Sequence, residues 1–262
     1  MGFIVAILLI VISIGAFYYF GKDIWYPYYD KYLVEKDVAP IECPKCPKCP
    51  EKIKIVEKNV TIFKKLEENL TSKQRLKRYL ADSDFVIYPK KLTLIALKHE
   101  KRLEVWGKRD KEWKHIHDYS FSGFSGKLGP KLQQGDRQIP EGIYGISYLN
   151  PNSKFHLSMK IDYPNEFDKK MAKRDKRVNL GGDIMIHGSD KTIGCIPIGD
   201  ESIEELYFLA QKVGIKNIKV ILSPVDFRRM TVRIKNDKYP WLKELYRDIK
   251  EELTPFISKN NP

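Results

Sequence analysis

The stretch that decides the fold and the chemistry is GGDIMIHGSDKTIGC, residues 181–195. An apolar segment ends at His187, a polar turn follows, and Cys195 stands eight residues after the histidine. A thiol becomes a nucleophile when a neighbouring base takes its proton, and histidine is suited to that task near neutral pH. Cys195 as nucleophile and His187 as base are therefore a candidate catalytic pair. On spacing alone, a structural cysteine beside a histidine that has its own partners is the default, and the surrounding sequence is what favours the catalytic pair.

Two glycines flank the turn between the predicted pair. Gly188 and Gly194 allow backbone conformations that a side chain would forbid. The backbone N–H groups of Gly194 and Cys195 are predicted to form an oxyanion hole. An ion pair between Cys195 and His187 would favour both charges, so we expect a lowered pKa of the thiol and a raised pKa of the imidazole.

Short apolar or alternating segments surround this stretch and predict strands. They are FVIYP (85–89), KLTLIAL (91–97), RLEVWGK (102–108), WKHIHDYSF (113–121), GIYGISYL (142–149), KFHLSMKI (154–161), DIMIHG (183–188) and IKVILS (218–223). A helical period runs from residue 201 to Gly214, and another from 240 to 257. Many strands around one central helix favour an α+β domain that is mainly β.

The N-terminal residues 2–21 carry no charged side chain. About 20 apolar residues at ~1.5 Å each span a hydrocarbon core of ~30 Å. A cleaved signal peptide is the rival, but it needs a basic segment first and small residues at the cleavage site. Instead the segment ends in FYYF, residues 17–20. We therefore expect an uncleaved single-span anchor.

A linker and a stalk follow the predicted anchor. Residues 40–50 read PIECPKCPKCP, in which Cys43, Cys46 and Cys49 repeat every third residue on an extended polyproline-like segment. Outside the cytoplasm these thiols favour a disulfide-linked oligomer, and a low-complexity spacer with incidental cysteines is the alternative. A closed zinc site lacks its fourth ligand, so no metal is predicted. Residues 51–82 are helical in pattern, with Thr71 or Ser72 as a cap.

Length and composition exclude some classes of protein. The chain has 262 residues and a formal net charge of +13, with 42% hydrophobic residues and four cysteines. A wholly disordered chain and a disulfide scaffold are excluded. The basic residues are scattered without a nucleic-acid-binding motif, so no nucleic acid is predicted. The expected division is an anchor (1–21), a linker and stalk (22–83), a catalytic domain (84–225) and a C-terminal extension with a helix (226–262).

Three segments in a fixed order carry a resemblance to a known family. GDRQIPEG (135–142), FHLSMKIDYPN (155–165) and the IHG-x5-GC core (186–195) resemble the L,D-transpeptidase catalytic domain of the YkuD type. They are most similar to its compact YafK-like branch of murein transpeptidases and hydrolases. The resemblance covers roughly residues 84–225. It implies a β-sandwich-like α+β domain with a helix after the catalytic cysteine, and no cofactor.

The resemblance also implies a reaction. Cys195 would attack the carbonyl of the third residue of a peptidoglycan stem peptide and form a thioester. His187 would move the proton, and the Gly188 carbonyl would orient its ring. An amine acceptor gives transpeptidation. A water acceptor gives a carboxypeptidase, or a hydrolase that releases cross-links or a wall-linked protein.

The sequence departs from the family pattern next to the nucleophile. Thr192-Ile193 precede Gly194-Cys195, and Ile196-Pro197 follow, where many members have Ile-Arg after the cysteine. The arginine that would bind a substrate carboxylate is therefore missing from its usual place. The substrate-binding candidates are His156, Arg137, Lys131 and Ser189. The basic loop 174–177 is a further candidate for substrate binding, and a solvated surface loop is the alternative.

The wall substrate bears on topology. Peptidoglycan lies outside the inner membrane, so we expect a single-pass bacterial inner-membrane protein whose catalytic domain faces the periplasm or cell wall. Lysines 22, 31 and 36 after the span oppose this orientation under the positive-inside rule. Three other functions remain open: a papain-like hydrolase with Asp183 or Asp200 as third residue, a non-catalytic wall-binding protein, and a membrane-tethered nucleic-acid binder.

Overall fold

The computed structural model describes residues 70–232 and 239–257 of the chain. At its centre lies β1 (Lys91–Leu97), in which every residue after the first is buried. A strand that is apolar on both faces needs cover on both faces. Leu94 and Ala96 belong to one apolar core, whereas Ile95 and Leu97 belong to a second core on the other side.

Within the described residues, the strands form one continuous order, β3-β2-β1-β8-β4-β5-β6-β7. Besides β1 they are β2 (Arg102–Lys108), β3 (Trp113–Ser120), β4 (Gly142–Ser153), β5 (His156–Ile161), β6 (Met185–His187), β7 (Ile196–Pro197) and β8 (Ile218–Ser223). The β1–β8 and β6–β7 pairs are parallel and the others antiparallel. Strand β4 pairs with β8 at its start and with β5 from Ile146 onward, so it joins the two halves of the sheet.

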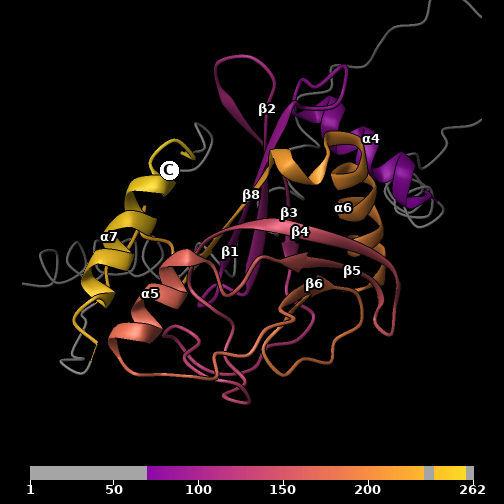
Figure 1. The fold of residues 1–262 in the computed structure, drawn as a ribbon. Coiled ribbons are helices and arrows are strands. Elements are labelled where there is room, and N and C mark those ends of the chain that lie inside the picture. The colour runs from indigo at the N-terminus through magenta and orange to yellow at the C-terminus, as the bar shows by residue number, and fades with distance from the viewer. Residues whose placement is uncertain (1–69, 233–238, 258–262) are drawn as a thin grey trace, which may run out of the picture. The chain divides into compact units, whose positions relative to one another are not determined.

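Helices cover both faces of this sheet (Figure 1). On one side α4 (Ser72–Asp82) lies beside α6 (Asp200–Val213), and a short 3-10 helix, Ile215–Asn217, follows α6. On the other side lie α5 (Glu166–Arg174) and α7 (Leu242–Leu253). The α+β class is therefore confirmed.

The helices that the sequence predicts begin and end near their expected residues. Helix α4 begins after Thr71, whose capping box with Gln74 satisfies N–H groups at the helix start. Helix α6 follows the cysteine and ends at Gly214, which has a φ of 84°. A positive φ is the backbone geometry that favours glycine at the end of a helix. Helix α7 lies inside the predicted range 240–257.

The segment FVIYP, residues 85–89, is not a strand, and that prediction was wrong. The Phe85 N–H bonds to the carbonyl of Leu80 at the end of α4, and Val86 is 99% exposed. Strands β1 and β2 already have neighbours on both sides. A preceding segment finds no free edge in that part of the sheet, however apolar it is.

Two further differences concern the region between β4 and α6. Strand β4 continues through residues 150–153, beyond the predicted end of that strand at residue 149. Helix α5 was not predicted. Its start is marked by Asn165, whose side chain accepts from the Asp168 N–H while the Asp168 carboxylate accepts from the Asn165 N–H.

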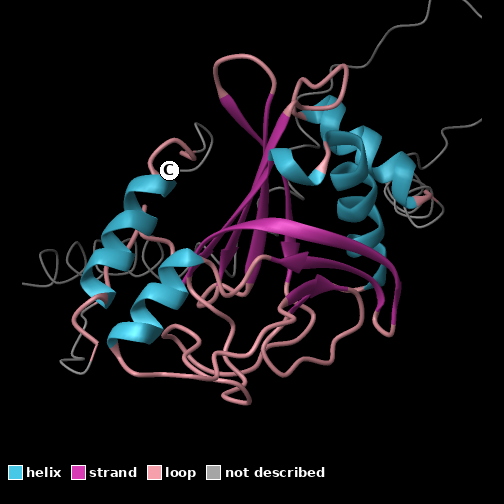
Figure 2. Cartoon of the chain, viewed as in Figure 1, coloured by secondary structure: helices cyan, strands magenta, loops and turns pink. Residues whose placement is uncertain are grey.

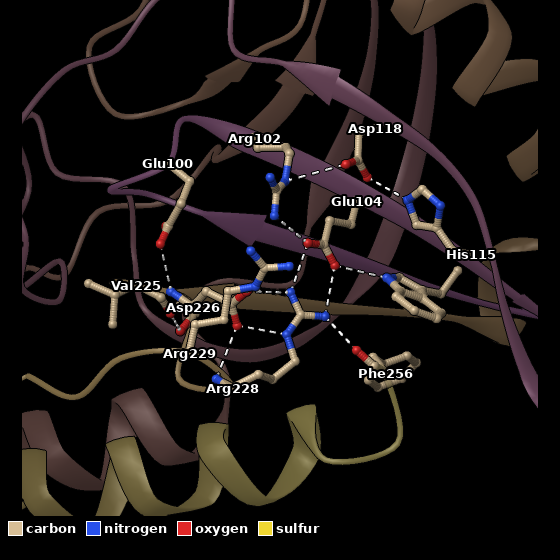
Figure 3. A network of polar contacts seen from close by, with 12 residues as sticks. Glu100, Arg102, Glu104, His115, Asp118, Val225, Asp226, Arg228, Arg229 and Phe256 are labelled. Atoms are coloured by element: carbon tan, nitrogen blue, oxygen red, sulfur yellow. Dashed lines mark hydrogen bonds and ion pairs between the residues drawn. The ribbon is translucent and has the colours of Figure 1, made fainter. Parts of the chain in front are cut away.

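The residues after β8 are tied to the sheet by a polar network around Arg228 (Figure 3). Its guanidinium donates to both oxygens of Glu104 on β2, at 3.0 and 2.8 Å, and to Asp226 at 2.7 Å. It also donates to the Phe256 carbonyl just after α7, at 2.6 Å. Trp106 donates to the same glutamate. Residues 226–232 and 239–257 therefore pack onto the sheet through both charge and apolar contact.

The predicted anchor at residues 2–21 and the cysteines at 43, 46 and 49 lie outside the described residues. In the part of the chain that the structure describes, no helix is long and apolar enough to cross a membrane.

Candidate active site

His187 ends strand β6, and Cys195 stands just before the neighbouring strand β7, at one end of the sheet. His187 is the last residue of β6, and it pairs with Pro197 of β7 on one side and with Ser158 of β5 on the other. Cys195 directly precedes β7, and the backbone N–H of Met185 faces its sulfur. The parallel register pairs Ile186 with Ile196, so Cys195 lies level with Met185, two residues before His187 along the neighbouring strand. Figure 2 shows the loops that surround β5 and β6.

The His187 ring is held in one tautomer. Its Nδ1 donates to the backbone carbonyl of Gly188, which has no hydrogen to give, so Nδ1 carries the proton. Nε2 is buried and has no hydrogen-bond partner among the described residues. The ring of Phe155 lies over the imidazole, with 4.7 Å between ring centroids. Burial lowers the pKa of His187, so a neutral imidazole presents an unprotonated Nε2.

The Cys195 thiol is half-buried and protonated at rest. Sγ donates to the Asp183 carbonyl at 3.6 Å. Burial raises the pKa of the thiol and outweighs the Met185 N–H and the Lys131 charge, which lower it; the Asp183 charge raises it further. The prediction of a lowered thiol pKa and a raised imidazole pKa was therefore wrong. Both groups lose water when buried, which favours the neutral thiol and the neutral imidazole.

Thr192 occupies the N–H groups that were predicted to form the oxyanion hole. Its Oγ1 accepts from the Cys195 N–H at 2.9 Å and the Gly194 N–H at 3.2 Å, and it donates to the Cys195 carbonyl at 2.8 Å. Gly194 has a φ of 128°, and a Cβ there would lie 3.0 Å from the Gln138 carbonyl oxygen. The turn before the cysteine is therefore tightly fixed, and in this conformation both N–H groups are already used.

Close packing explains Gly188. A Cβ at this position would lie 2.4 Å from Oδ1 of Asp200 and 2.9 Å from the Phe155 carbonyl oxygen. The next residue, Ser189, has a φ of 59°, and its N–H donates to the same Asp200 oxygen at 2.6 Å. The Ser122 hydroxyl donates to the Ser189 carbonyl. These contacts hold the backbone of Ser189, a predicted substrate-binding residue, in a rarely used conformation.

One curated sequence from Escherichia coli K12 is similar to this chain. This protein, named "Putative L,D-transpeptidase YafK", is 28% identical over 168 residues, which are 63% of this chain and 66% of the relative. The protein of the same name from E. coli O157:H7 gives the same values. The chain is therefore similar in sequence to a putative L,D-transpeptidase. The match spans just under two thirds of the relatives' length, and no family model matches the sequence.

Solved structures with similarity to this L,D-transpeptidase relative include two bacterial proteins. The helical cell shape determining protein Pgp2 from Campylobacter jejuni is 23% identical over 61% of this chain and 57% of that chain, with a TM-score of 0.43. L,D-transpeptidase 1 from Mycobacterium tuberculosis is 10% identical over 51% and 62%, with a TM-score of 0.30. Both TM-scores are low, so the relationship rests on the sequence match.

Two predicted substrate-binding residues lie in the loop before β4. Lys131 is buried, and its Nζ bonds to Asp136 at 2.6 Å and to the Gln133 carbonyl at 2.9 Å, so it is not free for a substrate carboxylate. Arg137 is exposed at a φ of 56°, beside the Gly194 backbone. No partner of its guanidinium is found within the described residues. The structure thus separates Lys131, which is internal, from Arg137, which is available.

His156 lies beside Gly188 but bonds away from the nucleophile. Its Nε2 is 2.7 Å from Oε1 of Glu204 on α6. A Cβ on Gly188 would lie 3.1 Å from the His156 Cβ. The structure therefore gives His156 a contact between β5 and α6, whereas its predicted role in substrate binding has no support from this geometry.

Lys160 is a site residue that the sequence analysis missed. It pairs with Met185 in the β5–β6 register, and its Nζ lies 2.5 Å from Oδ1 of Asp183, whose carbonyl accepts from Cys195. Alternate positions of a strand share a face. The alternating polar residues at 156, 158 and 160 of FHLSMKI could have indicated that Lys160 shares a strand face with the candidate His156.

Neither Asp183 nor Asp200 hydrogen-bonds to the His187 ring. Asp183 bonds to Lys160, and Asp200 bonds to the Ser189 N–H. The arrangement therefore differs from a papain-like triad, in which a third side chain contacts the histidine directly. Within the described residues, no cluster of three or more His, Cys, Asp or Glu side chains could hold a metal ion.

Proposed function

We propose that the protein is a cysteine acyltransferase of the L,D-transpeptidase type that acts on peptidoglycan stem peptides. One observation carries the proposal. His187 is buried and neutral, its Nδ1–H is fixed on the Gly188 carbonyl, its Nε2 has no hydrogen-bond partner among the described residues, and Cys195 directly precedes β7, the strand that pairs with β6. A fixed tautomer with a free basic nitrogen is the arrangement that general-base activation of a nucleophile requires.

The chemistry follows from these protonation states. The Cys195 sulfur attacks the carbonyl carbon of a stem-peptide amide while its proton passes to Nε2 of His187. The carbon–nitrogen bond then breaks, and the imidazolium returns the proton to the leaving amine. A thioester remains on Cys195. An acceptor amine or water attacks that thioester, gives its proton to His187 and releases the product, and the thiol regains its proton. Because the resting pair is neutral, charge develops only during reaction.

Charged groups around the nucleophile fit a substrate that carries carboxylate and ammonium groups. Arg137 is exposed at the rim beside Gly194, and Lys160 with Asp183 lies beside Cys195. A substrate carboxylate would replace Asp183 on Lys160 or bind Arg137 through paired hydrogen bonds. A diamino acid in the stem peptide presents both kinds of group, and this supports a wall peptide as the substrate.

The location and partners belong to the same proposal. Residues 2–21 would anchor the chain in the inner membrane, with the catalytic domain facing the periplasm or cell wall. The stalk cysteines Cys43, Cys46 and Cys49 would link copies of the chain through disulfides. A reporter that is active only outside the cytoplasm, fused after Pro262, tests the orientation; activity of a cytoplasm-only reporter at that position would refute it.

The deciding experiment uses full-length protein and defined muropeptides, with product analysis by mass spectrometry. Wild type should exchange or release the residue that follows the third position of the stem peptide. Cys195→Ala should abolish turnover and leave the thermal unfolding midpoint nearly unchanged. A protein with Cys43, Cys46 and Cys49 changed to Ser is the matched control and should retain activity. Turnover by Cys195→Ala would overturn the proposal.

The products also identify the acceptor. A new amide bond indicates transpeptidation. A free carboxylate indicates a carboxypeptidase, or a hydrolase that releases cross-links or a wall-linked protein. No turnover of any muropeptide, together with binding of the intact wall polymer, would favour a non-catalytic wall-binding protein.

A further inference from the structure

One peptide group connects His187 to a carboxylate. The carbonyl of Gly188 accepts from Nδ1 of His187. The N–H of the same peptide unit belongs to Ser189 and donates to Oδ1 of Asp200 at 2.6 Å. The order is therefore imidazole N–H, peptide carbonyl, peptide N–H and carboxylate. The catalytic histidine and Asp200 lie at opposite ends of a single amide.

The surrounding backbone is built to keep this contact. Gly188 brings its Cα so close to Asp200 that a Cβ would lie 2.4 Å from Oδ1. Ser189 adopts a φ of 59°, which is costly for a residue with a side chain unless other contacts hold it. Gly199, the residue before Asp200, has a φ of 82° and offers no side chain to cap α6. The close approach at Gly188 and the positive φ angles of Ser189 and Gly199 thus all lie around the hydrogen bond from Ser189 to Asp200.

The chemical effect of the contact follows from amide polarisation. A carboxylate that accepts from a peptide N–H forms a short charge-assisted bond. Such a bond shifts electron density within the amide and strengthens its carbonyl as an acceptor, by roughly 10–30% in condensed-phase estimates. A stronger acceptor at Gly188 holds the proton on Nδ1 of His187 more firmly. It also fixes the plane of the ring.

We propose that Asp200 is a positioning residue for His187 and acts through the Gly188–Ser189 peptide. It takes the place of the carboxylate that contacts histidine directly in other nucleophile–histidine sites. The proposal deepens the proposed function, because it rests on His187 being the base. The geometry itself is independent of the substrate, and the test below needs no substrate.

The test compares three variants of the full-length chain by 15N NMR with 15N-labelled histidine. Wild type should show His187 as the Nδ1–H tautomer. Asp200→Ala should give a mixture of tautomers, whereas Asp200→Asn keeps an acceptor oxygen and should restore most of the Nδ1–H form. Glu201→Ala is the matched control, since Glu201 is also acidic in the first turn of α6 but does not contact Ser189. It should leave the His187 signals unchanged.

A second readout follows the nucleophile in proteins that also carry Ser at positions 43, 46 and 49. Alkylation of Cys195 by iodoacetamide at pH 7 should slow by roughly ten-fold in Asp200→Ala, the lower end of the loss that follows when a partner that orients a metal-bound histidine is removed. Asp200→Asn should lie between Asp200→Ala and wild type. Wild-type tautomers in Asp200→Ala, or equal effects of Asp200→Ala and Glu201→Ala, would overturn the proposal. If the wild type does not turn over muropeptides but Asp200→Ala shows the expected mixture of tautomers, the proposed function is refuted and the positioning role of Asp200 stands.

Discussion

The Nζ of Lys98 lies 2.9 Å from Oε1 of Glu141, and neither side chain is exposed to solvent. Lys98 also donates to the carbonyl oxygens of Gly129 and Ile139, at 2.7 and 2.9 Å. Tyr246 of α7 donates to the other oxygen of Glu141 at 2.6 Å. One buried ion pair therefore joins the end of β1, the loop that leads to β4, and the C-terminal helix.

Replacing Lys98 by Met should lower the free energy of unfolding by about 3–5 kcal/mol, because Glu141 would stay buried without its counter-ion. The double change Lys98→Met and Glu141→Gln should recover part of that loss. Urea denaturation followed by circular dichroism measures both. Lys219→Met is the control: Lys219 lies 2.7 Å from Glu252 on the surface, and such pairs contribute about 0–1 kcal/mol. Equal losses at both sites would contradict the prediction.

Gly188→Ala should reduce turnover of muropeptides by about 100-fold, the scale of a 1 Å misplacement at an active site. Its Cβ would collide with Oδ1 of Asp200 and move the carbonyl that holds His187. Gly182→Ala is the control, since a Cβ there has no atom within 4 Å. Steady-state kinetics of both variants, beside their thermal unfolding curves, separate a local effect from unfolding. Wild-type turnover by Gly188→Ala would show that this close approach is dispensable.

Thr192→Val should lower the free energy of unfolding by about 1–3 kcal/mol, because the N–H groups of Gly194 and Cys195 would lose their acceptor. Valine has nearly the same shape, so the loss reports the hydroxyl. Thr192→Ser keeps the hydroxyl and should stay close to wild type. Chemical denaturation measures the difference. If Val and Ser variants are equally stable, the hydroxyl does not hold the turn.

Asp183→Asn should lower the pKa of Cys195. The negative charge of Asp183 disfavours the thiolate and raises the pKa of the thiol, after burial, which is the larger cause. Removing that charge leaves burial in place, and it frees Lys160 to favour the thiolate. The pH profile of Cys195 alkylation should shift to lower pH. Asp190→Asn, a change in the turn before the nucleophile, should leave the profile in place. An unchanged or raised midpoint in Asp183→Asn would disprove the assignment.

Arg137→Asn should raise KM for a stem peptide about ten-fold and leave kcat nearly unchanged, since losing one charged contact costs on the order of 1.5 kcal/mol. Asparagine tolerates the positive φ of this position, so the backbone is kept. Arg109→Ala, far along the chain on the β2–β3 connection, is the control. A fall in kcat at constant KM would show that Arg137 serves the reaction rather than ground-state binding.

Local features of the site and fold followed from the sequence. Helix α6 follows from a helical period of apolar residues, and its end follows from Gly214. Both signals are local in the sequence. The strand that ends at His187 depends on an apolar run before a polar turn. The placement of Cys195 beside that strand needed only a short loop.

Features that depend on distant residues did not follow from the sequence. Residues 85–89 have strand composition, but β1 and β2, the strands that follow them in the chain, already have neighbours on both sides. The pKa of Cys195 rises because other segments bury it, and no spacing of residues reports burial. Lys131 has the charge expected of a substrate-binding residue, yet Asp136 holds it inside the loop.

The Arg228 network has a consequence for where the chain can be shortened. A protein that ends at residue 225 would lose Arg228, which holds the buried Glu104, and with α7 it would lose the cover over Ile95 and Leu97. A protein cut at the limit of family resemblance would therefore expose one whole side of β1. Trimming of the C-terminus past Phe256 would already remove the carbonyl that receives the Arg228 guanidinium.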